Sequence, residues 1–324
     1  AKNEYFIVWT TTPWTIPYNL AIMVNPEIEY VRTKVDNEIW IIAKALANVV
    51  ISGVIGKKFS VVEEMKGEKL LGMEYEPPCK DDIDYSKLKR QWPKTHSVIL
   101  SRKYVDTSAG SGLVHCAPGC GPEDFEVAQE YGIGSFNTLD EKGIFLEIEK
   151  FAGWKARKDD AKFIQILKEK GAFLAESRVE HDYAHCWRCR NPIIYRATEQ
   201  WFLKIEDLIP ELIKCNESVY WWPKFGKTNM KIWMENLRDN SISRQRFWGA
   251  PIPIWTCSKC GSIEVIGSVK ELEEKAGKVP EDLHRPWIDA VKIPCRKCKA
   301  EMSRIEDIID VWIDSGTDSW NCLY

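Results

Sequence analysis

The sequence predicts an α+β fold, with a β-barrel-like first part and peripheral helices, followed by a helical segment that carries a metal-binding ribbon. Short runs rich in β-branched and aromatic residues predict strands at 5–9, 30–33, 39–42, 97–100 and 113–114. Stretches bounded by turn residues predict helices at 43–51, 123–131 and 159–170. Two Cys-x-x-Cys pairs, at 257–260 and 295–298, predict the ribbon.

The composition is that of an ordinary folded protein, with 44% hydrophobic and 29% charged residues among 324. A net charge of −3 excludes a uniformly basic nucleic-acid-binding surface, although local basic strips remain open. We find no membrane span and no signal peptide. Eleven cysteines, including three Cys-x-x-Cys pairs, are typical of metal binding in a reducing compartment, so we expect a cytoplasmic protein. We also expect a monomer.

A glycine-rich stretch precedes a predicted strand and helix. Gly110, Ser111 and Gly112 allow a close backbone approach or a positive φ, and His115 follows at the end of the strand. Asp124 lies in the first turn of the predicted helix, where free N–H groups favour an ionised carboxylate. A fixed negative charge beside a glycine-lined cavity and an imidazole suits a small cationic group. Alternatively, Asp124 only caps its helix and His115 is a core residue.

Four threonines near the start of the chain form a second candidate feature. Thr10, Thr11, Thr12 and Thr15 follow a β-rich run and offer short, stiff donors and acceptors for a polar ligand. The alternative is an edge strand that ends in a turn.

The cysteine pairs predict a metal centre. Cys257, Cys260, Cys295 and Cys298 supply the four thiolates of a tetrahedral Zn²⁺ site. Because such a site leaves no position for water, we expect structural zinc. Cys186 and Cys189 are only half of a site, and their partners would lie outside this chain.

Aromatic and basic residues alternate over 219–256, as in Tyr220, Trp222, Lys224 and Arg244. This pattern suits RNA backbone contact and base stacking. It is equally typical of a cationic rim over an aromatic core.

Several separated motifs together resemble the isoleucyl-tRNA synthetase family of class I aminoacyl-tRNA synthetases. They occur in the family's order and span nearly the whole chain: Trp9-Thr10-Thr11-Thr12-Pro13-Trp14-Thr15, the stretch 110–124, His185-Cys186-Trp187-Arg188, Ser243-Arg244-Gln245-Arg246-Phe247-Trp248-Gly249 and Asp310-Val311-Trp312-Ile313-Asp314-Ser315-Gly316. The resemblance implies a Rossmann-type core interrupted by an editing insertion, and a chain that is part of something larger. Neither the His-Ile-Gly-His nor the Lys-Met-Ser-Lys-Ser element is present, so ATP and Mg²⁺ would serve only the full-length enzyme.

The resemblance also implies roles for single residues. Asp124 matches the acid that grips the substrate α-ammonium, and His115 matches the histidine at the end of the side-chain pocket. The threonine-rich wall is matched by Thr10, Thr11, Thr12 and Thr15, and the substrate-binding positions by Trp9, Asn19, Gly110, Ser111 and Gly112. The expected organisation is an editing domain at 1–180, a connection at 181–250, a zinc-binding segment at 251–305 and the start of a Rossmann-core strand at 306–324.

These matches predict an esterase that deacylates valyl-tRNA(Ile) or valyl-adenylate, with the tRNA acceptor end as its partner. Water attacks directly in this interpretation, because no activated Ser or Cys nucleophile is evident. Two alternatives remain open: a non-catalytic, zinc-stabilised tRNA-binding module, and the editing domain of a related branched-chain synthetase.

Overall fold

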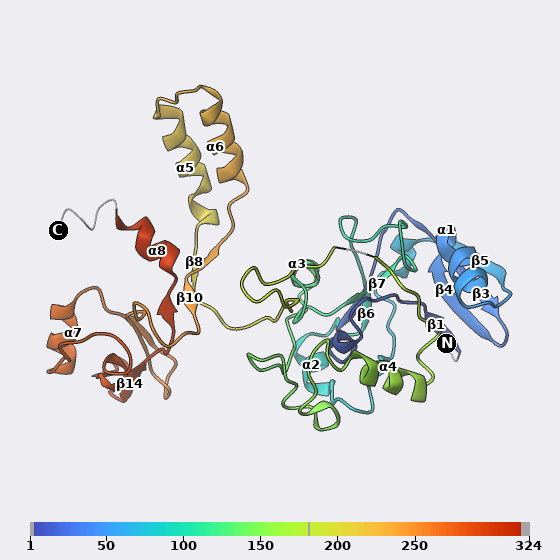
Figure 1. Ribbon diagram of the computed structural model, residues 1–324, viewed down its shortest axis with the longest axis horizontal. Helices are drawn as coiled ribbons and strands as arrows, with labels where there is room; N and C mark the ends of the chain where they lie inside the picture. Colours follow the sequence, from blue (N-terminus) through green and yellow to red (C-terminus); the bar gives the residue numbers. More distant parts are fainter. Residues whose placement is uncertain (1–2, 181, 319–324) are drawn as a thin grey trace. The chain divides into compact units, whose positions relative to one another are not determined.

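The structure, a computed structural model, describes residues 3–180 and 182–318 (Figure 1). The chain divides into two compact units, Ala1–Ala197 and Thr198–Tyr324. Within the described residues, no helix combines the length and apolar character that crossing a membrane requires.

The first unit contains a four-stranded sheet of order β1-β4-β3-β5. Its strands are β1 (Glu4–Phe6), β3 (Glu29–Val35), β4 (Glu38–Ala43) and β5 (Ser60–Lys66). Alternation along β4 places Ile41 in one apolar cluster and Trp40 and Ile42 in another, so both faces are covered. Helix α1 (Lys44–Ala47) and a π-helical turn follow β4 directly, and α1 contacts β3 and β4 (Figure 1).

A three-stranded sheet of order β6-β2-β7 positions the candidate site. It consists of β2 (Ala21–Val24), β6 (Ser97–Leu100) and β7 (Leu113–Cys116). Strand β2 is parallel to β6 and antiparallel to β7, with Ile22 opposite His115. Two isolated bridges extend the edges of this sheet: Trp9 pairs with Val114 of β7, and Glu74 pairs with Ser97 of β6.

The β-barrel expectation is wrong for the residues that the structure describes. Their strands form separate open sheets. In the sheets β1-β4-β3-β5 and β6-β2-β7, the last strand does not pair with the first, so neither sheet closes. Strand β5 ends one ladder with most of its residues exposed to solvent. Short strands are equally compatible with open sheets and barrels, because closure depends on long-range pairing that local patterns do not encode.

Besides α1, three helices of the first unit pack against a core rich in aromatic rings. They are α2 (Ser86–Gln91), α3 (Pro122–Glu130) and α4 (Asp160–Glu169), and the last two confirm the expected helices at 123–131 and 159–170. Pro122 stands in the first turn of α3, where its missing N–H leaves no bond unmade. In the core, Tyr18 stacks on Phe145 with ring centroids 5.1 Å apart, and Phe163 packs against Phe145 at 5.2 Å.

The second unit begins with a helical hairpin and two short strand pairs. Helices α5 (Ile209–Ser218) and α6 (Phe225–Glu235) lie side by side (Figure 1). The strand pairs join β8 (Phe202–Leu203) to β9 (Asn240–Ser241), and β10 (Ser243–Arg244) to β15 (Ile308–Ile309).

An antiparallel four-stranded sheet of order β12-β11-β14-β13 forms the expected ribbon. Its elements are β11 (Ile254–Thr256), β12 (Ile263–Val265), β13 (Lys292–Pro294) and β14 (Glu301–Arg304), with α7 (Val269–Ala276) inserted between the two hairpins. The Ser268 side chain accepts a hydrogen bond from the Glu271 backbone N–H at 3.1 Å, and thereby caps α7.

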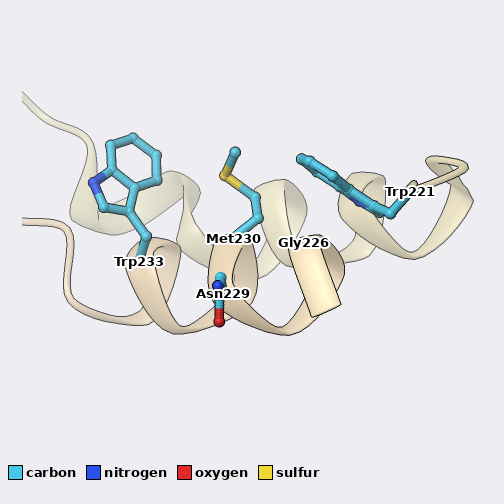
Figure 2. A pocket seen from close by; sticks show the side chains of 5 residues that line it. All are labelled: Trp221, Gly226, Asn229, Met230 and Trp233. Carbon is cyan, nitrogen blue, oxygen red and sulfur yellow. The ribbon is translucent and has the colours of Figure 1, made fainter. Parts of the chain in front are cut away.

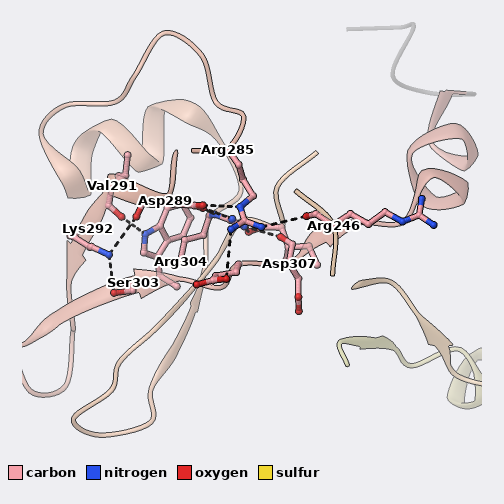
Figure 3. Close-up of polar contacts among 11 residues, drawn as sticks. Arg246, Arg285, Asp289, Val291, Lys292, Ser303, Arg304 and Asp307 are labelled. Carbon is pink, nitrogen blue, oxygen red and sulfur yellow. Dashed lines mark hydrogen bonds and ion pairs between the residues drawn. The ribbon is translucent and has the colours of Figure 1, made fainter. Parts of the chain in front are cut away.

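A buried arginine, Arg304, links segments of the ribbon through its hydrogen bonds (Figure 3). Arg304, 5% exposed, donates through Nε to Asp289 at 2.9 Å and through Nη1 to the Asp307 carbonyl at 2.9 Å. Arg285 donates to the other oxygen of Asp289 at 2.8 Å. Burial alone would raise the pKa of Asp289, but the hydrogen bonds from Arg304 and Arg285 outweigh it, and the pKa lies below its usual range. The two guanidinium groups therefore keep this carboxylate ionised.

Within the segment 306–324, where the start of a Rossmann-core strand is expected, residues 311–316 form a helix, α8 (Val311–Gly316). The Asp310 side chain accepts a hydrogen bond from the Trp312 backbone N–H at 2.7 Å, and this cap favours a helical turn over the β-propensity of Val311, Trp312 and Ile313. Residues 319–324 of the expected Rossmann strand lie outside the described residues.

Candidate active site and metal centre

Three of the four threonines form a chain of hydroxyl groups that leads to His115. Thr10 Oγ1 lies 3.2 Å from Thr12 Oγ1, which lies 3.2 Å from Thr15 Oγ1. Thr15 Oγ1 in turn lies 2.9 Å from His115 Nε2. The structure thus brings together Thr15 and His115, which lie a hundred positions apart in the sequence. Thr11 is exposed and is not part of this chain.

The hydrogen bonds around His115 define its tautomer. Asn19 Nδ2, which can only donate, lies 2.7 Å from His115 Nδ1, so Nδ1 is the acceptor and Nε2 carries the proton. The Thr15 hydroxyl donates to the Thr12 carbonyl at 2.8 Å, which leaves its oxygen free to accept from Nε2–H. Burial lowers the pKa of His115 to about 4. His115 is therefore a neutral ring with both nitrogens engaged, suited to shaping a pocket and not to proton transfer near pH 7.

Two residues of this network, Tyr75 and His96, were not anticipated. The Tyr75 hydroxyl donates to Asn19 Oδ1, and His96 Nε2 donates to the Asn19 carbonyl at 3.1 Å. Burial lowers the pKa of His96 to about 4 as well. His96 directly precedes the strand at 97–100, and Tyr75 lies in the charged, turn-rich stretch before it, in which no local pattern marks either residue. The bridge between Glu74 and Ser97 and the hydrogen bond from the Tyr75 N–H to the His96 carbonyl bring Tyr75 to the site.

Asp124 lies close to this network along the chain and is partly buried. Its Oδ2 accepts a hydrogen bond from the Ala117 backbone N–H at 3.0 Å, two residues beyond His115. Burial raises the pKa of Asp124 to about 7, and neighbouring Glu123 adds to the effect. A carboxylate in this setting gains from a nearby cation, because pairing with a positive charge offsets the loss of hydration.

The glycine-rich stretch owes much of its composition to packing within the unit. At Gly112, where φ is +75°, an added Cβ would lie 2.3 Å from the Cβ of Ala43. At Gly110 an added Cβ would meet the ring of Trp9 at 3.0 Å. The hydroxyl of Ser111, which is buried, donates to the Leu113 carbonyl at 3.2 Å. Substrate contact by these residues stays a prediction.

Another carboxylate, Asp160, contacts the threonine-rich segment. The Trp14 backbone N–H donates to its Oδ1 at 3.3 Å, and burial raises the pKa of Asp160 to about 6. Its position at the start of α4 resembles that of any helix-capping acid, so the sequence offered no signal for this contact.

The four predicted cysteines come together at the tips of the two ribbon hairpins. The sulfur atoms of Cys257, Cys260, Cys295 and Cys298 all lie within 4.8 Å of one another. The Sγ–Sγ distance is 3.5 Å between Cys257 and Cys298 and 3.6 Å between Cys260 and Cys295. Four sulfurs at about 2.3 Å from a tetrahedral Zn²⁺ would be roughly 3.8 Å apart. The donor set therefore fits a metal ion such as zinc.

Both cysteine loops have the same backbone geometry. The N–H of the first cysteine donates to the carbonyl five residues later, at 2.9 Å for Cys257 and 2.8 Å for Cys295. The residue four positions on donates back to the cysteine carbonyl and has a positive φ, +68° at Gly261 and +61° at Lys299. This turn directs both sulfurs of a pair to one point.

The loop at Cys186 repeats this geometry in the first unit. The Cys186 N–H donates to the Asn191 carbonyl at 2.8 Å, and the Arg190 N–H donates to the Cys186 carbonyl at 2.8 Å, with φ at Arg190 of +59°. Cys186 and Cys189 are thus arranged like half of the cluster in the second unit. Within the described residues, they belong to no group of three or more clustered ligands.

The α5–α6 hairpin carries exposed aromatic side chains. A pocket of about 460 Å³ is lined by five residues of this hairpin and its connection, Trp221, Gly226, Asn229, Met230 and Trp233, whose side chains are drawn in Figure 2. Tyr220 and Trp222, in the connection between the helices, are 88% and 81% exposed. Apart from the amide of Asn229, the side chains that line this pocket are apolar or aromatic, so the pocket suits packing or stacking better than catalysis.

The chain belongs to the class I tRNA synthetases (I, L, M and V), whose family model matches residues 10–323. It is 44% identical to the isoleucine–tRNA ligase of Methanopyrus kandleri, over 99% of this chain and 30% of the relative. Against the isoleucine–tRNA ligase of Archaeoglobus fulgidus the identity is 43%, over 99% of this chain and 31% of the relative. The chain thus spans about a third of the length of these relatives, and the resemblance to isoleucyl-tRNA synthetases is confirmed.

Solved structures overlap with the chain only in part. The crystal structure of GlLeuRS-CP1 has a TM-score of 0.44 and 16% identity, covering 56% of this chain and 87% of that chain. The editing domain of the cytosolic leucyl-tRNA synthetase of P. knowlesi has a TM-score of 0.38 and 15% identity, covering 53% and 83%. The fold described above rests on the strand pairing of this chain alone.

Proposed function

We propose that the first unit hydrolyses the ester bond of valyl-tRNA(Ile), and the mixed anhydride bond of valyl-adenylate, as the proofreading site of an isoleucine–tRNA ligase. The observation that carries the proposal is the hydrogen-bonded chain from Thr10 to His115, with Asp124 bonded to the backbone two residues beyond His115. Isoleucine–tRNA ligases are the relatives that match nearly all of this chain.

The problem that such a site solves is one of size. Valine lacks one methylene of isoleucine, and one methylene is worth only about 1–3 kcal/mol of discrimination, a limit for which the isoleucine enzyme is itself the standard example. A second pocket that admits valine and excludes isoleucine corrects the resulting errors. The His115 ring, held at both nitrogens, would form the wall that sets this size.

Each remaining group has a role in the reaction. Asp124 would hold the α-ammonium and so place the ester carbonyl. The hydroxyls of Thr10, Thr12 and Thr15 and nearby backbone N–H groups would orient the ester and the attacking water and stabilise the oxyanion. A hydroxyl of the terminal tRNA ribose would accept a hydrogen bond from the attacking water and relay its proton to the ribose oxygen that leaves as the ester bond breaks. Neutral His115 has no free nitrogen to do so.

The test is deacylation of valyl-tRNA(Ile) and isoleucyl-tRNA(Ile) by the purified chain. We expect hydrolysis of the valyl ester only, abolished by Asp124→Ala and retained by Glu123→Ala, which removes a carboxylate from the same helical turn. Full activity of Asp124→Ala would refute the assignment. A panel of other aliphatic aminoacyl-tRNAs tests the alternative of a related branched-chain editing domain.

The second candidate function is a non-catalytic, zinc-stabilised tRNA-binding module. The exposed side chains of Tyr220 and Trp222, flanked by Lys224, favour it. Binding of tRNA(Ile) without hydrolysis of any ester would support this function over the first.

The remaining assignments extend the proposal to the rest of the chain. We assign structural Zn²⁺ to the four-cysteine cluster and a second metal half-site to Cys186 and Cys189. ATP and Mg²⁺ belong to the activation reaction of the full-length enzymes. The acceptor end of tRNA(Ile) is the expected partner, and the protein is expected to be a cytoplasmic monomer. The four-part organisation with boundaries at 180, 250 and 305 is kept as a prediction.

A further inference from the structure

Asn19 lies at the centre of the hydrogen-bond network around His115, and both polar atoms of its side-chain amide form hydrogen bonds. Its Nδ2 donates to the Ala21 carbonyl at 2.9 Å and to His115 Nδ1 at 2.7 Å, so both amide hydrogens are used. Its Oδ1 accepts from the Tyr75 hydroxyl. Asn19 is only 5% exposed. The amide therefore serves the neighbouring ring of His115, with no N–H left to offer a ligand.

Two contacts decide which way the amide points. A carbonyl can only accept, so the Ala21 carbonyl requires the NH₂ group on its side. A hydroxyl that donates requires the oxygen on the opposite side, and Tyr75 supplies that hydroxyl. If the amide turned over, its oxygen would face both the Ala21 carbonyl and an unprotonated nitrogen of His115. His115 would then have to move its proton to Nδ1 and lose its donor to Thr15 Oγ1.

Tyr75 is itself fixed by the backbone and by ring packing. Its N–H donates to the His96 carbonyl at 3.0 Å, and Glu74 bridges to Ser97 on the edge of β6. Its ring packs edge-on against Phe6 at 6.3 Å and against His96 at 5.7 Å. The hydroxyl is thus presented to Asn19 by a side chain with little freedom to move.

We propose that Tyr75 is a positioning residue of this site: by donating to Asn19 it orients the side-chain amide, and the amide fixes His115 as the Nε2–H tautomer bonded to Thr15. The predicted effect on hydrolysis rests on the proposed function, whereas the predicted tautomer of His115 does not. Tyr75 acts through Asn19 and His115 and does not touch the substrate. Its removal should lower the rate of hydrolysis more than it raises KM, because fewer molecules hold the productive arrangement.

Tyr75→Phe removes the donor and keeps the ring. Tyr85→Phe is the matched control, since Tyr85 also packs against His96, at 4.6 Å, but its hydroxyl donates to the Pro17 carbonyl at 2.7 Å and not to Asn19. Leaving a buried acceptor unsatisfied at Asn19 should lower kcat for valyl-tRNA(Ile) about tenfold. Tyr85→Phe should change kcat less than twofold. The double variant Tyr75→Phe with Asn19→Ala should be no slower than Asn19→Ala alone.

The decisive readout is the ¹⁵N spectrum of the His115 ring at pH 7, which needs no catalysis. We expect protonated Nε2 and unprotonated Nδ1 in the wild type and in Tyr85→Phe, and a mixed or exchanging ring in Tyr75→Phe. A wild-type ring protonated at Nδ1 would overturn the proposal, and so would a Tyr75→Phe ring identical to the wild type. If the wild type hydrolyses no ester, the proposed function fails, while the spectrum still decides the role of Tyr75.

Discussion

Asp124→Asn should change the pH dependence of stability in a way that reports the environment of this carboxyl directly. Burial raises the pKa of Asp124 from 3.8 to about 7 in the folded chain, whereas the unfolded chain keeps the ordinary value. Below about pH 4 the carboxyl is protonated in both the folded and the unfolded state, so it adds no pH dependence to the free energy of unfolding. Between pH 4 and 7 it ionises only in the unfolded state, so the wild type loses stability as the pH rises.

The size of the effect follows from the two pKa values. Each pKa unit corresponds to about 1.4 kcal/mol, so the free energy of unfolding of the wild type should fall by up to about 4 kcal/mol across this interval. Above pH 7 the carboxyl is ionised in both states and the loss is constant. Asparagine keeps an acceptor for the Ala117 N–H but carries no charge, so Asp124→Asn should lack this pH dependence.

Urea denaturation of the wild type and of Asp124→Asn at intervals from pH 4.5 to 8.5 measures the difference, in which all other titrating groups cancel. Glu123→Gln is the control, because it removes a charge from the same helical turn. We expect the stability of Asp124→Asn relative to the wild type to rise by about 1.4 kcal/mol per pH unit and to level off near pH 7. A difference that does not vary with pH would refute the account of a desolvated carboxyl.

Three further predictions concern the ribbon and the glycine-rich stretch. Elemental analysis should find about one zinc ion per chain at the four-cysteine cluster, lost in Cys295→Ser, and a chain purified with no bound metal would contradict the assignment. Gly112→Ala should destabilise the first unit by about 2–4 kcal/mol. The control, Gly72→Ala, also has a positive φ but nothing within 4 Å of the added Cβ, and should cost about 1 kcal/mol. Equal shifts of the urea midpoint in the two variants would contradict the packing argument. Asp289→Asn should destabilise the ribbon by about 3–5 kcal/mol because buried Arg304 loses its counter-charge, and unchanged melting of the ribbon would contradict this.

Much of the local structure could be predicted from the sequence because local chemistry determines it. Pro122 and the acids after it mark the start of α3, and the Cys-x-x-Cys spacing fixes each turn of the metal cluster. The convergence of Thr15 and His115 was expected from the resemblance and is found at 2.9 Å. In each case a few neighbouring residues, or a matched motif, carry the information.

Other features depend on contacts between distant segments, and the sequence gives no local sign of them. The open sheets replace the expected barrel because strand pairing, and not strand number, decides closure. Helix α8 is a different case, because its cause is local: the side chain of Asp310 caps it, although Val311, Trp312 and Ile313 have high β-propensity. Tyr75 reaches Asn19, 56 residues away in sequence, only through pairing at the edge of β6.

We propose that Asp124 anchors the ammonium of a misattached valine beside the His115 ring. A crystal structure of the chain with a non-hydrolysable valyl-adenosine analogue tests it most directly. We expect the analogue's ammonium nitrogen to lie within hydrogen-bond distance of the Asp124 carboxylate, and its side-chain methyl groups to pack against the His115 ring. An analogue bound with its ammonium away from Asp124, or bound elsewhere on the chain, would contradict it.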